Sequence, residues 1–112
     1  MNGTVDLVIA GDASASRAAA IGALQQGQRV LVVLRSADAR VAQRLRRCLR
    51  RTTGMDSIRL SVMTCAEVVC VDGVGGVEAV VIRYGRTGRL CAVNTSAFFS
   101  CDSAMKATDG LA

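Results

Sequence analysis

The chain has 112 residues, of which 51% are apolar and 3% aromatic, and its formal net charge is +5. This length and composition predict a single domain over residues 1–112, built on a buried sheet with packed helices. The absence of histidine from the sequence excludes His-based catalysis and Cys/His zinc sites, and the scarcity of aromatic residues disfavours a nucleic-acid binder that stacks bases.

The first part of the chain has the pattern strand, turn, helix, strand. Val5–Ala10 is an almost continuous apolar run, which is typical of a central strand buried on both faces. An alanine-rich helix is expected to start near Ser14, with Ser14 or Ser16 as its N-cap, and Gly27 is expected to end it in a left-handed conformation. Arg29–Leu34 is the second predicted strand. This order predicts the opening βαβ unit of a dinucleotide-binding fold.

The second predicted helix is amphipathic and strongly basic. Asp38 is its expected N-cap, and the helix is expected to run to about Thr52 and to stop near Gly54. One face carries Val41, Leu45, Cys48 and Leu49, and the other carries Arg40, Arg44, Arg47 and Arg51. The basic face suits either a solvated surface in an Arg-biased genome or a contact with phosphate or an acidic partner, and the residues leave both interpretations open.

The rest of the chain is rich in predicted strands separated by glycine turns. A short polar tail from residue 102 is expected to fray. The predicted strands are Ser57–Met63, Ala66–Val71, Val77–Tyr84, Arg89–Asn94 and Ser96–Cys101.

The five cysteines form no metal-like CxxC pair, and most of them lie within apolar runs. They are therefore predicted to be reduced core residues, which favours an intracellular compartment. The N-terminus lacks a signal-peptide pattern, and no apolar run approaches membrane-spanning length, so a soluble protein without a membrane span is expected. The cysteines are Cys48, Cys65, Cys70, Cys91 and Cys101.

The order of elements over residues 5–103 resembles the NADPH-binding domain of the two-dinucleotide-domain flavoproteins, the group that includes thioredoxin reductase. This resemblance implies an α/β, three-layer Rossmann-like βαβαβ fold with a parallel sheet, an antiparallel β-meander and a final return strand. The family's G-x-G-x-x-G/A motif falls on Gly11, Ala13 and Ser16, so one of its three glycines is retained. Asp12 adds a negative charge where a pyrophosphate would sit.

Two further matches concern the nucleotide site. The family's H-R-R-x-x-x-R pattern, which clamps the 2′-phosphate of NADPH, aligns with residues 34–40 and places Arg35 and Arg40 on two of its three arginines. No acidic residue ends the second strand, which argues against a ribose-binding NAD site. In the return strand, Cys101 and Asp102 replace the small residues that line the nucleotide site in the family.

Three functional hypotheses follow, and none assigns a catalytic residue. The favoured one is a non-catalytic, degenerate domain that binds no cofactor and acts as a structural or accessory subunit of a larger, flavoprotein-related complex, with a protein partner at the basic helix 38–52. These 112 residues hold neither the flavin domain nor the redox-active CxxC of the family, so hydride transfer by this chain alone is not expected.

The second hypothesis is an NADP(H)-binding module that supplies or senses nucleotide, and the third is a basic subunit contacting nucleic-acid phosphates. The sequence also leaves open whether the chain forms a homo-oligomer through the predicted meander. In the second hypothesis the cofactor-binding residues are Gly11, Ala13, Ser14, Ser16, Arg35 and Arg40.

Overall fold

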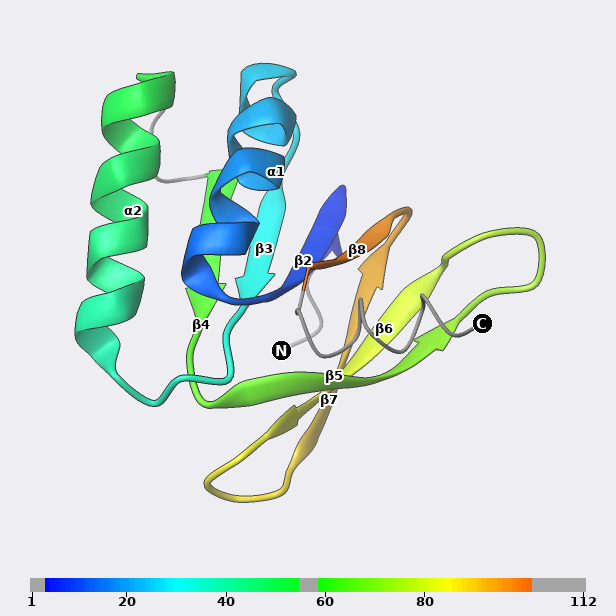
Figure 1. Cartoon of the computed structure of the whole chain (residues 1–112). Helices are drawn as coiled ribbons and strands as arrows, with labels where there is room; N and C mark the ends of the chain where they lie inside the picture. The colour runs from blue at the N-terminus through cyan, green and yellow to red at the C-terminus, as the bar shows by residue number, and fades with distance from the viewer. Residues whose placement is uncertain (1–3, 55–58, 102–112) are drawn as a thin grey trace, which may run out of the picture.

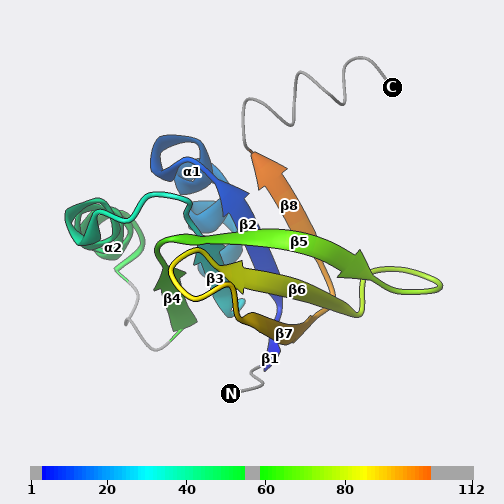
Figure 2. The ribbon, with the colours of Figure 1, turned by 90° about the horizontal axis from the view of Figure 1, so that it is seen from below.

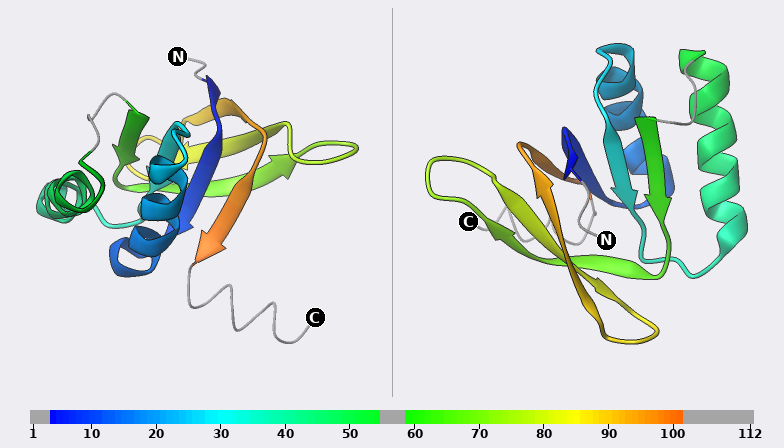
Figure 3. Two further views of the ribbon diagram at one scale, coloured as in Figure 1. Left: turned by 90° about the horizontal axis from the view of Figure 1, so that it is seen from above. Right: turned by 180° about the vertical axis from the view of Figure 1, so that it is seen from behind.

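Three layers make up residues 4–54 and 59–101, which are the residues that the computed structural model describes (Figure 1). Two helices form one outer layer, a parallel four-stranded sheet forms the middle layer, and a second four-stranded sheet forms the other outer layer (Figures 2 and 3). The polar tail from residue 102 and the expected start of a strand at residue 57 lie outside the described residues. In chain order the elements are β1 (Thr4–Val5), β2 (Leu7–Gly11), α1 (Ala13–Gln25), β3 (Val30–Val33), α2 (Ala39–Thr53), β4 (Leu60–Met63), β5 (Ala66–Asp72), β6 (Ala79–Tyr84), β7 (Leu90–Thr95) and β8 (Phe98–Cys101).

The middle sheet confirms the predicted α/β topology. Its strand order is β4-β3-β2-β8, and every neighbouring pair is parallel. β8 is the expected return strand, because it comes back from the outer sheet and pairs with β2. The outer sheet has the order β1-β7-β6-β5, and β5, β6 and β7 form the expected antiparallel meander. No helix within the described residues is long and apolar enough to cross a membrane.

The first predicted strand is divided between the two sheets. The sequence favoured one strand over Val5–Ala10, whereas the structure has β1 paired with β7 and β2 paired with β3. The break falls at Asp6, whose carboxylate accepts a 2.7 Å hydrogen bond from the N–H of Arg29. The N–H groups of Asp6 and Leu7 both donate to the carbonyl of Arg29, at 2.9 and 3.1 Å. These contacts hold the chain where it passes from one sheet to the other.

The ends of α1 confirm one prediction and correct another. The N-cap is Asp12, not Ser14 or Ser16, because the N–H of Ser16 already donates to the Asp12 carbonyl at 2.8 Å and both serines lie inside the helix. At the other end Gly27 has the expected left-handed conformation, with φ +80°. Its N–H donates to the carbonyl of Leu24 at 3.0 Å, which satisfies one of the unpaired carbonyls of the last turn.

α2 begins and ends where the sequence predicts. The Asp38 carboxylate accepts a 2.9 Å hydrogen bond from the N–H of Arg40, and Gly54 ends the helix with φ +65° and an N–H bonded to the carbonyl of Arg50. On the predicted apolar face, Leu45 and Leu49 are buried. The helix therefore attaches to the sheet through a narrow apolar stripe and leaves its arginines in solvent.

Two separate cores hold the three layers together. Adjacent residues of β2 serve different cores, since Ile9 faces the helices and Val8 faces the outer sheet, and both are completely buried. The middle sheet is thus apolar on both faces, as in other parallel sheets. The helix-side core contains Ile9, Ala20, Ala23, Leu24, Val30, Val32, Leu34, Leu45 and Leu49, and the sheet-side core contains Val8, Leu31, Val33, Ala66, Val80, Ile82 and Val93.

The cysteines do not fill these cores. Cys48, Cys65 and Cys91 are half-buried and Cys70 is exposed, so none of these four is fully buried as predicted, although Cys91 packs against the sheet-side core and all four are free thiols as expected. The hydrogen bond between the Cys70 thiol and the Asp72 carboxylate, 3.2 Å long, raises the pKa of Cys70 above its ordinary value because the neighbouring negative charge disfavours the thiolate. β5 therefore carries an exposed thiol whose deprotonation the neighbouring carboxylate disfavours.

Candidate functional site

The carboxyl ends of the parallel strands form the candidate site. Ligands of open α/β sheets bind outside this edge, where strands lead into the starts of helices. Here β2 leads into α1 and β3 leads into α2 at the same end of the molecule (Figure 1). Gly11 ends β2 with φ +148°, a conformation that favours glycine, and Arg35 follows β3. The first glycine of the motif therefore occupies the tight turn that the sequence predicts.

Gly11 and Arg35 line one small hollow at this edge. Its other walls come from the ends of β2 and β3 and from the start of β5, including Ala66 and Val68. The hollow has a volume of about 20 Å³, little more than a single water molecule needs. Pockets that bury a small organic ligand measure roughly 300–1,000 Å³. The part of the edge shared by Gly11 and Arg35 is therefore closed by packing between the two sheets.

The other residues of the glycine motif lie elsewhere. Ala13 and Ser14 line a groove of about 380 Å³ between α1 and α2, together with Arg17 and Arg44. Ser16 is completely buried, in keeping with the small residue that close helix–strand packing requires. The structure thus brings Ala13 and Ser14 together, but it does not bring them into the hollow of Gly11 and Arg35.

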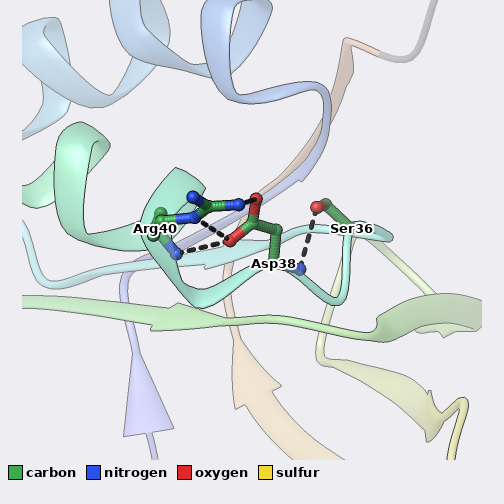
Figure 4. Close-up of polar contacts among 3 residues, drawn as sticks. All are labelled: Ser36, Asp38 and Arg40. Carbon is green, nitrogen blue, oxygen red and sulfur yellow. Dashed lines mark hydrogen bonds and ion pairs between the residues drawn. The ribbon is translucent and has the colours of Figure 1, made fainter.

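Arg40 is engaged by its own helix cap. Its guanidinium contacts both carboxylate oxygens of Asp38, with Nε 3.2 Å from Oδ1 and Nη2 3.4 Å from Oδ2 (Figure 4). The Ser36 hydroxyl in turn accepts a 3.1 Å hydrogen bond from the N–H of Asp38. The hydrogen bonds from Arg40, side chain and backbone, lower the pKa of the Asp38 carboxyl, and the charge of Arg44 adds to this effect. Arg35 lines two hollows at this edge, and Arg40 lines neither of them.

This cap predicts a pH-dependent contribution to stability. Because the pKa of Asp38 is lower in the folded state, the stabilisation is present above the unfolded pKa and is lost as the pH falls through the folded pKa. Asp38→Ala is expected to lower the thermal midpoint at neutral pH and to match the wild type at strongly acidic pH. Asp38→Ser keeps a capping oxygen without the charge, so most of the stability is expected to remain and the contribution of residue 38 to the pH dependence is expected to disappear. Thermal melts at several pH values measure this, and an unchanged profile for Asp38→Ala would refute it.

A second hollow beside Arg35 was not anticipated from the sequence. It has a volume of about 200 Å³ and is lined by Cys65 and by the ion pair of Glu67 and Arg83. Cys65 is the one non-glycine residue in the described ranges with a positive φ, +53°. Its carbonyl accepts a 2.7 Å hydrogen bond from the N–H of Gly85, so the turn from β4 into β5 is fixed against the β6–β7 turn. A cysteine in an apolar stretch gives no sequence signal for such a conformation.

The described residues hold no group of three or more His, Cys, Asp or Glu side chains that could bind a metal ion. The side chains that do lie near this edge include the guanidinium groups of Arg35 and Arg40, the carboxylates of the two N-caps and the thiol of Cys65.

No protein-family model matches the sequence, and no curated protein matches it. Solved structures do match. The thioredoxin reductase of Streptococcus pyogenes superposes over 88% of this chain with a TM-score of 0.62 and 19% identity, and that of Giardia duodenalis over 90% with 0.64 and 16%. The chain shares the Rossmann-like α/β fold found in these thioredoxin reductases. A myxobacterial FAD-dependent halogenase also shares this fold, with a TM-score of 0.67 over 88% of the chain at 14% identity.

The Rossmann-like fold seen here is only part of those proteins. The chain spans 31% of each of the two thioredoxin reductases and 37% of the halogenase. At such identities the likeness concerns the backbone and carries no residue roles with it, since one fold supports many functions.

Proposed function

We propose that this chain is a non-catalytic, dinucleotide-binding-like domain that acts as an accessory subunit of a larger, flavoprotein-related assembly. The observation that carries the proposal is the dispersal of the nucleotide-motif residues. Gly11 and Arg35 share a hollow of about 20 Å³, Ala13 and Ser14 line a different groove, and Arg40 pairs with Asp38. Both apolar cores are well packed, whereas the residues of the nucleotide motif are distributed among separate hollows.

The residues of this edge do not fit a dinucleotide. Leu34, 1% exposed, is part of the helix-side core and directly follows β3, where these folds place an acidic ribose ligand when they bind NAD. Ala13 has a Cβ where a glycine would let the pyrophosphate approach the backbone. The exposed carboxylate of Asp12 stands at the start of α1 and repels an anion from the helix N-terminus. Ala13 and Asp12 therefore disfavour the pyrophosphate of any dinucleotide, and Leu34 in addition disfavours the ribose of NAD.

Calorimetric titration with NADPH, NADH, FAD and ADP tests this proposal. The folded chain is expected to show no saturable heat with any of them, which corresponds to dissociation constants weaker than about 1 mM. Circular dichroism of the same sample confirms that the protein is folded.

The second candidate is an NADP(H)-binding module, and the position of Arg35 beside Gly11 favours it. In that case NADPH would bind more tightly than NADH, and Arg35→Ala and Arg40→Ala would each weaken the binding. Arg50→Ala is the matched control, because it removes the same group from the far part of α2. NADPH binding that falls in the first two variants and not in the control would replace the accessory proposal with this one.

A further inference from the structure

The groove between α1 and α2 begins beside the glycine turn, with which it shares Ala13 and Ser14, and extends along both helices. Ala13 and Ser14 form its wall on α1, and Val41, Leu45 and Cys48 form its wall on α2. Ala13, Val41 and Leu45 also pack into the helix-side core, so the floor of the groove is apolar and fixed. Its volume of about 380 Å³ suits a single bulky apolar side chain with its neighbours.

Two arginines border this apolar floor. Arg17 reaches across the groove from α1, and its Nη1 lies 3.8 Å from the Cys48 sulfur on α2. Arg44 stands on the α2 side, is exposed, and makes no ion pair with any acidic side chain in residues 4–54 and 59–101. Residues 39–53 contain no Asp or Glu, and the acidic N-cap of the helix, Asp38, is already paired with Arg40.

Further arginines extend this charge along one side of the helix. Each residue turns an α-helix by about 100°, which places Arg40, Arg47 and Arg51 within about 60° of Arg44. Arg46 and Arg50 fall on the opposite side, and the Arg46 guanidinium donates to the carbonyl of Val62 on β4 at 3.3 Å. The positive charge that borders the groove is therefore distinct from the positive charge that faces β4.

We propose that this groove docks an acidic amphipathic peptide segment of a partner protein. The inference rests on the accessory role proposed above and specifies its partner. An apolar side chain of the segment enters the groove over Val41 and Leu45, and flanking carboxylates pair with Arg17 and Arg44, whose forked guanidinium groups match carboxylate geometry. A nucleic acid fits less well, because its phosphates leave the apolar floor unused and none of the groove residues is an aromatic platform for a base.

Fluorescence anisotropy with a labelled model peptide tests the groove. The probe is a short helical peptide with leucines on one face and glutamates beside them. Wild-type protein is expected to bind it saturably, and Arg44→Glu and Arg17→Glu are each expected to weaken the binding about tenfold or more. Arg50→Glu makes the same charge change on the opposite side of α2 and is expected to change the affinity by less than about twofold.

A second peptide tests the contribution of the apolar floor to binding, and a labelled RNA tests the alternative partner. A peptide with its leucines replaced by glutamines is expected to lose most of the affinity, because it cannot use the apolar floor. The proposal is overturned if the wild type does not bind the peptide, if Arg50→Glu weakens binding as much as Arg44→Glu, or if a labelled single-stranded RNA binds more tightly with the same dependence on Arg44. Titration of Arg44→Glu with NADPH distinguishes failure of the accessory role from failure of the peptide-docking proposal. NADPH binding would contradict the accessory role, and the peptide-binding result would be unaffected by it.

Discussion

Leu49→Ala is expected to destabilise the protein by about 2–5 kcal/mol. Leu49 is completely buried in the helix-side core, where it joins α2 to the middle sheet. Truncation removes apolar contacts and leaves a cavity that the rigid sheet below cannot fill. Urea denaturation monitored by circular dichroism measures the loss as a lower midpoint with an unchanged slope.

Leu90→Ala is the matched control for that experiment. The chemical change is identical, but Leu90 is 64% exposed on β7, so the expected loss is within about 0.5 kcal/mol. Similar losses for the two variants would contradict the assignment of α2 as part of the packed core.

Gly73→Ala is expected to cost about 1–3 kcal/mol or to rearrange the β5–β6 turn. Gly73 has φ +158°, and a Cβ added there would lie 1.6 Å from the carbonyl oxygen of Gly76. The turn must open to admit the methyl group, and this weakens the 2.8 Å hydrogen bond from the N–H of Glu78 to the carbonyl of Asp72. Urea denaturation gives the cost, and amide hydrogen exchange at Glu78 reports the opening.

Gly75→Ala provides the comparison two residues away. A Cβ at Gly75 meets nothing within 4 Å, so this variant is expected to keep wild-type stability and exchange. If both variants behave alike, the tight conformation at Gly73 does not constrain the meander.

The sequence predicted most of the fold because its signals are local. Asp38 and Gly54 define α2 through hydrogen bonds to residues within one turn, and Gly27 ends α1 in the same way. The division of the first strand at Asp6 depends on pairing with β7, about 90 residues later, and no local pattern encodes it. Asp12 was overlooked as the N-cap because the serines that follow it are equally good capping residues.

The candidate site was less predictable than the fold. Alignment with a phosphate-clamp motif singled out Arg40, but Asp38, two residues earlier, already supplies an ion-pair partner. The groove was missed because Arg17 and Cys48 are 31 residues apart and meet only when the two helices pack. The basic face of α2 was visible from the sequence, whereas its separation into a groove side and a β4 side depends on contacts such as that of Arg46 with Val62.

The contact of Asp6 with Arg29 has a consequence for the alignment of the central strands. In most sheets the alternation of polar and apolar residues prevents neighbouring strands from slipping by one position, because a slip would expose the apolar face. β2 and β3 are apolar on both faces, so a slip would only exchange one buried aliphatic residue for another. The Asp6 carboxylate bonds to one backbone N–H at the start of β3 and thereby selects the pairing of Leu7 with Val30. The Asp6 carboxylate, together with the two N–H groups bonded to the Arg29 carbonyl, thus favours one alignment among those that the apolar strands would tolerate.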